Sequence, residues 1–229
     1  MELLLSPNGQ YFFLEMNTRL QVEHPVTEMI TGVDLVQKQL EIASGIKLGI
    51  SQDSVGINGH SIEARIYAED AKKGFLPSVG TLGVWIPPSG PGIRMDSGVR
   101  QGDQVTVDFD PMLAKLIVHA SDRKSAIRRM DNALSSFVAL GVTTNIGFLR
   151  NALLHPSFTS GSITTDFLDS TPIEEFDPNY SNPKIIVSIA ASAKRLGLDK
   201  SANILSSSDE GDHSGHSGDP FKTLSRRLP

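Results

Sequence analysis

The sequence of 229 residues contains no cysteine. Without thiols the chain can form no disulfide, no thiolate metal site and no cysteine nucleophile, which fits a protein of a reducing compartment. No apolar run approaches the roughly 20 residues that cross a bilayer, so we expect no membrane contact. Acidic residues outnumber basic ones, and the net charge of −5 lacks the positive footprint of a nucleic-acid-binding protein.

What is present is the composition of an ordinary globular protein, with 39% hydrophobic and 21% charged residues. The length suffices for one large domain or two small ones, each with a real core. The first five residues show neither a basic region nor the cleavage pattern of a leader peptide. We expect them to form a strand of a domain that begins earlier in the full-length chain. We expect a cytoplasmic protein, or a mitochondrial matrix protein if the full-length chain carries a leader.

The pattern of the first 57 residues predicts a β-hairpin followed by a helix. Apolar runs at Glu2–Leu5 and at residues 11–17 are joined by a turn that contains Pro-Asn-Gly, which predicts two paired strands. Apolar residues then recur at intervals of three and four from Met29 to Ala43. This spacing predicts one helix, which Gly45 ends.

From Gly59 onward the sequence is rich in strand formers and is punctuated by glycine and proline, which predicts a mainly antiparallel sheet with flanking helices. The expected strands are residues 60–68, 81–87, 92–97, 104–109 and 113–120. The expected helices are one capped by Ser121 or Asp122, one from about Asn145 to Leu154, and one from Asn182-Pro183 to Gly197. The fold class is therefore α+β.

Polar side chains alternate with apolar ones between Glu15 and Glu23. If the chain is extended there, Glu15 and Asn17 project from one face about 7 Å apart. Closure of the hairpin brings Glu2 back beside Glu15, so that two carboxylates and an amide meet. Such oxygen ligands suit a hard cation such as Mg²⁺, together with phosphate and water oxygens.

The same face continues with hydrogen-bond donors and a further carboxylate. Arg19 and Gln21 suit a phosphate or a small planar anion, and Glu23 suits a general base. A solvent-exposed strand face of mixed charge is the alternative, and periodicity alone slightly favours it. The lack of lysine on this face and its apolar flanks favour a metal-phosphate or anion site instead.

The exact order of residues 11–28, which contain the string EMNTRLQVEHP, closely resembles the signature of the biotin carboxylases. These are the ATP-grasp components of acetyl-, propionyl- and methylcrotonyl-CoA carboxylase, pyruvate carboxylase and urea carboxylase. Further matches follow in order at residues 59–70, 75–80, 108–116 and 141–145. The resemblance covers about residues 2 to 170, and so long an ordered set is far more specific than any single motif.

The resemblance implies a metal and nucleotide site near the hairpin. Glu2, Glu15 and Asn17 would hold the Mg²⁺ or Mn²⁺ ions that bridge the phosphates of ATP. Leu4 and Val142 match apolar positions that sandwich the adenine. The domains would be the end of an ATP-grasp domain at 1–57, a biotin carboxylase C-terminal domain at 58–170, and a helix, polar linker and start of another module at 171–229.

The resemblance also implies a bicarbonate site. Arg19, Gln21 and Val22 would bind bicarbonate, Val22 through its backbone. Glu23 would be the base that deprotonates bicarbonate for attack on the γ-phosphate of ATP. The resulting carboxyphosphate would break down to CO₂ and phosphate, and the phosphate would take the ureido proton of biotin.

Arg65 would stabilise the biotin enolate, and Asp110 would help to order that pocket. Without the resemblance, the residues themselves favour purely structural roles for Arg65 and Asp110. Arg65 lies within a predicted strand and could pair with Glu63 or Asp110, and Asp110-Pro111 could be only a turn.

The family's Gly-rich phosphate loop and nucleotide-binding lysines have no counterpart in this sequence, and neither does the Met-Lys-Met turn that carries biotin. We therefore expect the chain to need an N-terminal ATP-grasp half. Two hypotheses stay open, a portion of an ATP-dependent biotin carboxylase and a non-catalytic remnant or oligomerisation module. A different ATP-grasp ligase is disfavoured because the Arg65 motif and the C-terminal domain are features of biotin carboxylases.

The partners implied are a biotin carboxyl carrier domain, a carboxyltransferase, the N-terminal half and a second copy of the chain. A homodimer would use the surface around Ile93-Arg94, although Pro91 stands where the family often has a supporting aromatic residue. The carboxyltransferase chooses the final carboxylated substrate, so this sequence does not specify it. His213 and His216 of the polar tail suggest a metal only weakly, because nothing around them fixes a coordination geometry.

Overall fold

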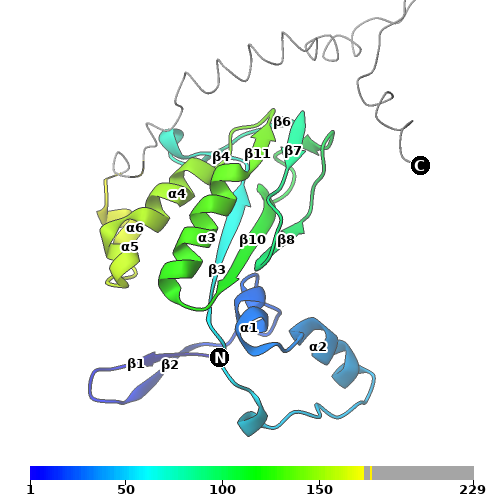
Figure 1. Cartoon of the computed structure of the whole chain (residues 1–229), viewed down its shortest axis with the longest axis vertical. Helices are drawn as coiled ribbons and strands as arrows, with labels where there is room; N and C mark the ends of the chain where they lie inside the picture. Colours follow the sequence, from blue (N-terminus) through cyan, green and yellow to red (C-terminus); the bar gives the residue numbers. More distant parts are fainter. Residues whose placement is uncertain (173–175, 177–229) are drawn as a thin grey trace, which may run out of the picture. The chain divides into compact units, whose positions relative to one another are not determined.

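The computed structural model describes residues 1–172 and Phe176 (Figure 1). The predicted helix from Asn182-Pro183 and the polar tail lie outside the described residues. Within the described part, helices and antiparallel strands are mixed, so the prediction of an α+β fold is confirmed.

The predicted hairpin is confirmed. β1 (Glu2–Leu5) pairs antiparallel with β2 (Tyr11–Glu15), and β2 ends two residues before its predicted limit at residue 17. Between the strands, the backbone N–H of Ser6 donates to the Gln10 carbonyl at 2.9 Å. Gly9 adopts φ +84°, a left-handed conformation that favours glycine, and this closes the turn.

Two helices replace the single helix predicted after the hairpin, so that prediction was wrong. They are α1 (His24–Thr31) and α2 (Leu35–Ala43). Gly32 ends α1 in the left-handed conformation with φ 73°. Asp34 then caps α2 by accepting a hydrogen bond from the backbone N–H of Gln37 at 2.7 Å. The apolar spacing runs across the break, although α2 contains no buried residue and its Leu40 is 68% exposed.

The centre of the fold is a three-stranded antiparallel sheet in the order β3 (His60–Tyr67), β10 (Met112–Ala120) and β8 (Ile93–Ser97). Helix α3 (Arg123–Ser136) packs on this sheet (Figure 1). Its N-cap is Asp122, one of the two residues predicted for that role. The core between helix and sheet includes Ala64, Ile66, Leu116, Val118, Ile127, Met130 and Leu134.

Short elements surround this centre. The strands are β4 (Glu69–Asp70), β5 (Leu76–Pro77), β6 (Gly80–Thr81), β7 (Val84–Ile86), β9 (Gln104–Val105) and β11 (Val138–Leu140). They pair as β4 with β5, β6 with β9, and β7 with β11. The helices are η1 (Gln52–Ser54), η2 (Ala71–Lys73), α4 (Ile146–Leu154), α5 (Pro156–Ser160) and α6 (Phe167–Ser170).

Two predicted strands are longer than the observed ones. The predicted strand 81–87 is divided into β6 and β7, because the backbone of the fully buried Leu82 bonds instead to Gly102 and Asp103. The predicted strand 104–109 ends at Val105, and Phe109 is 83% exposed. Val107 and Phe109 therefore lie at the surface, whereas Val105 is buried in the core.

Candidate functional site

The acidic cluster predicted at the base of the hairpin is present. Glu2 and Glu15 are register partners across β1 and β2. Nδ2 of Asn17 donates to Oε1 of Glu2 at 2.7 Å and to Oε1 of Glu15 at 3.3 Å. Nε2 of Gln21 donates to the same Glu2 oxygen at 3.2 Å. Two carboxylates and two amides thus meet, and the β pairing explains why residues 13 positions apart are neighbours.

The chemistry of this cluster fits a hard divalent cation. Among residues 1–172 and Phe176, no group of three His, Cys, Asp or Glu side chains is placed to hold a metal ion. A cation here would use the carboxylates of Glu2 and Glu15 together with amide, phosphate and water oxygens. Asn17 now points its amino group at both carboxylates, and a half-turn of the amide would present its oxygen instead.

The predicted base and the predicted biotin-binding arginine form an ion pair. Glu23 is the N-cap of α1 and Arg65 lies on β3, and Oε2 of Glu23 is 2.7 Å from Nη2 of Arg65. The two side chains are 49% and 42% exposed, so a ligand can reach both of them. Arg65 therefore pairs with Glu23 and not with Glu63, whose carboxyl oxygens have no hydrogen-bond partner in the described part of the chain.

The other predicted polar residues lie in three different settings. The Arg19 side chain donates to the Leu20 carbonyl at 3.3 Å and is exposed. The Val22 carbonyl accepts a hydrogen bond from Nζ of Lys115 at 3.0 Å. Asp110 accepts a 2.8 Å hydrogen bond from the backbone N–H two residues later and so closes the turn that leads into β10.

The two apolar residues predicted to sandwich adenine lie on different elements. Leu4 is on the hairpin and is 57% exposed. Val142 follows β11 and packs against the hydrophobic core, close to Gly80. Their joint role stays a prediction.

A charged array on the central sheet was missed by reasoning from sequence. Strand alternation turns Ala64, Ile66 and Leu116 towards α3, so their neighbours along each strand face the other way. The strand register sets these neighbours in two rows: Arg65, Lys115 and Asp96 in one, and Glu63, Ile117 and Arg94 in the next. The available signal was the charge placed inside otherwise apolar strands, above all the lysine in the run MLAKLIVHA.

Helix α1 is joined to this array by a second ion pair. Nη1 of Arg94 is 2.6 Å from Oε2 of Glu28, and the other Glu28 oxygen accepts from the backbone N–H of Leu35 at 2.8 Å. Nε and Nη2 of Arg94 also bind both Asp96 oxygens, at 2.8 and 2.9 Å. The surface predicted for a homodimer is thus partly occupied within the chain, since Ile93 also packs against the core.

Glu63 is the member of the charged array whose carboxyl group is buried and has a raised pKa. Both of its carboxyl oxygens are buried and lack a hydrogen-bond partner within the described part of the chain. Burial raises the pKa of this carboxyl from 4.5 to about 7, against the lowering effect of Lys115 on β10 and Arg65 on β3. Glu23 and Asp96 raise the pKa further. Around neutral pH a large share of Glu63 is therefore uncharged.

We expect Glu63→Gln to become progressively more stable than the wild type as the pH rises from 5 to 8. A carboxyl with a raised pKa stabilises the fold fully below about pH 4.5, and this stabilisation is lost as the pH rises through about 7. The relative gain should be about 1–2 kcal/mol, less than the full pKa shift implies because the residue is partly exposed. Denaturant unfolding followed by the fluorescence of Trp85, the sole tryptophan, measures it.

Glu41→Gln is the matched control. This carboxyl lies on α2, and a hydrogen bond from Lys38 lowers its pKa. The same chemical change there should give no gain with rising pH. A Glu63→Gln curve parallel to that of the wild type from pH 5 to 8 would contradict the buried, proton-holding state of Glu63.

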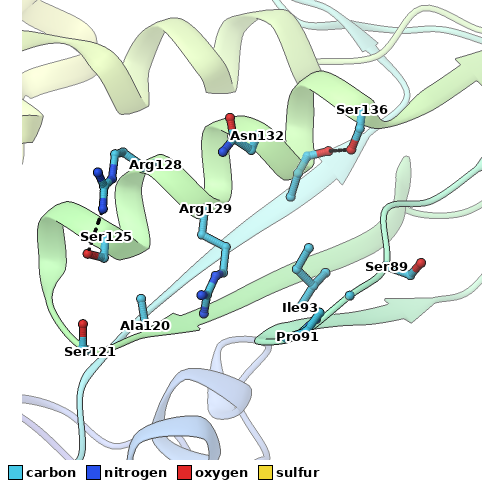
Figure 2. Close-up of a pocket in the computed structure, with 12 residues that line it drawn as sticks. Ser89, Pro91, Ile93, Ala120, Ser121, Ser125, Arg128, Arg129, Asn132 and Ser136 are labelled. Carbon is cyan, nitrogen blue, oxygen red and sulfur yellow. Dashed lines mark hydrogen bonds between the residues drawn. The ribbon is translucent and has the colours of Figure 1, made fainter.

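A separate cavity lies beside helix α3 and is lined by none of the residues predicted to bind metal, ATP, bicarbonate or biotin. It has a volume of about 590 Å³ and is lined by both polar and apolar groups. Figure 2 shows Ser125, Arg128, Arg129 and Asn132 of α3 on one side and Pro91 and Ile93 on the other. Arg128 bonds the Ser125 hydroxyl at 3.2 Å, and Arg129 bonds the His119 carbonyl. This cavity is thus distinct from the carboxylate cluster at the hairpin and from the pair of Glu23 with Arg65.

Comparison with known families assigns most of the described chain. Residues 63–170 match the model of the biotin carboxylase C-terminal domain. Residues 1–51 match the model of the ATP-binding domain of the carbamoyl-phosphate synthase L chain. None of the helices in residues 1–172 is long and apolar enough to span a bilayer.

Two similar curated proteins are subunits of CoA carboxylases. The mitochondrial propionyl-CoA carboxylase alpha chain of Caenorhabditis elegans is 43% identical over 203 residues, which are 88% of this chain and 28% of that protein. The mitochondrial methylcrotonoyl-CoA carboxylase subunit alpha of Oryza sativa subsp. japonica is 49% identical over 163 residues, which are 71% of this chain and 22% of that protein.

Solved structures agree with the fold. The biotin carboxylase domain dimer of Hydrogenobacter thermophilus 2-oxoglutarate carboxylase, solved with MgADP, ADP and bicarbonate, matches with a TM-score of 0.73 and 46% identity. The match covers 76% of this chain and 38% of that one. A biotin carboxylase complex from Campylobacter jejuni matches with a TM-score of 0.70 and 41% identity, over 74% of this chain and 37% of that one.

Fold and sequence together define a component of the biotin-dependent carboxylases. Within that class, the chain belongs to the biotin carboxylases and corresponds to the end of the ATP-binding domain plus the C-terminal domain. It spans 22–28% of the length of the two curated relatives and 37–38% of the two solved chains.

Proposed function

We propose that the chain supplies the bicarbonate, metal and biotin groups of an ATP-dependent biotin carboxylase. The reaction would convert ATP, bicarbonate and a biotinyl carrier protein to carboxybiotinyl carrier, ADP and phosphate. The observation that carries this proposal is the meeting of Glu23 with Arg65, 42 residues later in the chain, at 2.7 Å. A general base beside a cation is what deprotonation of bicarbonate and stabilisation of an anionic acceptor require.

The proposed roles fall into a metal site and a bicarbonate site. Glu2, Glu15 and Asn17 would hold Mg²⁺ or Mn²⁺, which would neutralise phosphate charge on bound ATP. Arg19 and Gln21 would bind bicarbonate oxygens through charged and amide N–H groups.

Close to the bicarbonate, the backbone of Val22 would add a further contact and Glu23 would accept the proton. Arg65 would then stabilise negative charge on biotin, and Asp110 would help to shape that pocket by fixing the turn before β10. The bicarbonate-bound and MgADP-bound carboxylase domain of Hydrogenobacter thermophilus supports these ligand classes.

The hairpin supports the need for an N-terminal half. Apolar side chains are exposed on both of its faces, including Leu4 (57%), Leu5 (63%), Tyr11 (69%) and Phe13 (64%). An isolated two-stranded hairpin is only marginally stable in water. We propose that an N-terminal ATP-grasp half covers these side chains and brings the phosphate loop and nucleotide-binding lysines.

The further partners would be a biotin carboxyl carrier domain and a carboxyltransferase. A homodimer is also proposed, on the precedent of the Hydrogenobacter thermophilus domain, which was solved as a dimer. The names of the curated relatives place those proteins in mitochondria, which supports the matrix over the cytoplasm for this chain.

We expect ATP hydrolysis that depends on both bicarbonate and free biotin once an N-terminal ATP-grasp half is supplied as a second polypeptide. The chain alone should give no such turnover, because nucleotide binding needs groups of the other half. Phosphate release, measured with each component omitted in turn, tests this expectation. A heat-unfolded N-terminal half serves as the control for contaminating hydrolysis.

Two results would count against the proposal in different ways. Turnover by the chain alone would contradict the need for the N-terminal half. Absence of turnover when both folded pieces associate would favour the second candidate, a non-catalytic remnant or oligomerisation module. The exposed hairpin favours that second candidate for the isolated polypeptide, because its apolar surface is uncovered.

A further inference from the structure

The segment from Val22 to Glu28 contacts the charged array of the central sheet at three points. Glu23 contacts Arg65 on β3, and Glu28 contacts Arg94 on β8. Between them, the Val22 carbonyl accepts a hydrogen bond from Nζ of Lys115 on the middle strand β10. The three contacts therefore reach all three strands of the sheet.

The middle contact differs from the outer two in burial and in chemistry. The Lys115 side chain is only 14% exposed, against 42% for Arg65 and 35% for Arg94. Its target is a backbone carbonyl, so it fixes the plane of the peptide that joins Val22 to Glu23. A charged hydrogen bond in a poorly hydrated place holds its partner more firmly than an exposed ion pair does.

Two carboxyl groups, those of Asp96 and Glu63, lie near the Lys115 ammonium group. Its carboxylate neighbour Asp96 lies 3.4 Å from Nζ and is already held by two hydrogen bonds from Arg94. The other nearby carboxyl is Glu63, whose oxygens accept no hydrogen bond in the described part of the chain. The ammonium group donates to the Val22 carbonyl at 3.0 Å while it stays within ion-pair distance of Asp96.

We propose that Lys115 is a positioning residue that sets the backbone of Val22 and Glu23 for bicarbonate. It acts through the peptide between these two residues and does not itself touch the substrate. The inference deepens the proposed function and rests on it for the identity of the ligand. Its structural part, the anchoring of this peptide by a buried lysine, stands on the contact alone.

The first test measures backbone hydrogen exchange in the chain itself. Lys115→Met keeps the side-chain length but removes the donor, and the fold should persist because Arg94 still neutralises Asp96. Exchange in peptides that cover residues 21–26 should rise about tenfold, as expected for the loss of one charged hydrogen bond. Lys124→Met, at an exposed lysine of α3, is the matched control and should leave this segment unchanged.

The second test separates positioning from mere stability. In the reconstituted enzyme, Lys115→Met should raise the KM for bicarbonate about tenfold and leave the KM for ATP unchanged. Lys115→Arg, which keeps a charged donor, should recover part of the bicarbonate affinity. If Lys115→Met does not fold, Lys115→Gln, with an uncharged donor on a shorter stem, takes its place in both tests.

The outcomes distinguish this inference from the function on which it rests. Unchanged exchange at residues 21–26 in a folded variant overturns the anchoring role. Wild-type turnover together with an unchanged bicarbonate KM in the variant overturns the positioning role and leaves the function intact. Faster exchange in the variant, combined with no turnover by the wild type, refutes the function and retains the anchoring by Lys115.

Discussion

Glu23→Gln is expected to lower bicarbonate-dependent turnover of the reconstituted enzyme by about 10²–10⁴-fold, the usual contribution of a general base. The amide keeps the size and shape of the carboxylate but accepts no proton at neutral pH. Stability should change by less than about 1 kcal/mol, because the pair with Arg65 is nearly half exposed. The loss should therefore appear in kcat while the melting temperature stays close to that of the wild type.

Glu41→Gln provides the control for this experiment. It makes the same replacement on α2, where the carboxylate accepts hydrogen bonds from its helical neighbours Gln37 and Lys38. Turnover should remain that of the wild type. If Glu23→Gln also keeps wild-type turnover, another group removes the proton from bicarbonate and the proposed role of Glu23 is wrong.

Gly141→Ala is expected to destabilise the fold by about 3–5 kcal/mol, from a strained backbone combined with overpacking. Gly141 adopts φ +112°, a conformation that side chains rarely tolerate. An added Cβ would overlap the carbonyl oxygen of Thr81 and lie 2.9 Å from the backbone nitrogen of Gly83. Both obstacles are backbone atoms, so no side-chain rotation can relieve the contact.

Gly56→Ala is the matched control for this effect. A Cβ at Gly56 meets no atom within 4 Å, and its φ lies outside the left-handed region. Its unfolding free energy should stay within about 1 kcal/mol of the wild type. Urea unfolding of all three proteins measures the difference, and a loss below 1 kcal/mol for Gly141→Ala would contradict the tight packing of this turn.

Sequence patterns predicted the structure correctly where it depends on residues close together in the chain. The Pro-Asn-Gly turn and its apolar flanks predicted the hairpin, and this pairing in turn predicted that Glu2 meets Glu15. The cap at Asp122 was predicted for the same reason, since a cap depends on the first turn of its own helix. The break at Gly32 was missed because the apolar spacing is nearly continuous across it.

Long-range pairing could not be predicted in the same way. Arg65 was assigned a role by resemblance, while its sequence neighbours favoured a pair with Glu63 or Asp110. Only the packing of α1 on the sheet brings Glu23 to it. The burial that raises the pKa of Glu63 likewise depends on segments from several strands and on the start of α1.

The sequence by itself determined the α+β class, the biotin carboxylase family and the cluster of Glu2, Glu15 and Asn17, because these rest on ordered motifs and on one local hairpin. Only the tertiary structure decided that Lys115 reaches the backbone of Val22, 93 residues away. The register of β3, β10 and β8 fixes which charges share a row, and a shift by one residue would turn each of them to the opposite face of the sheet.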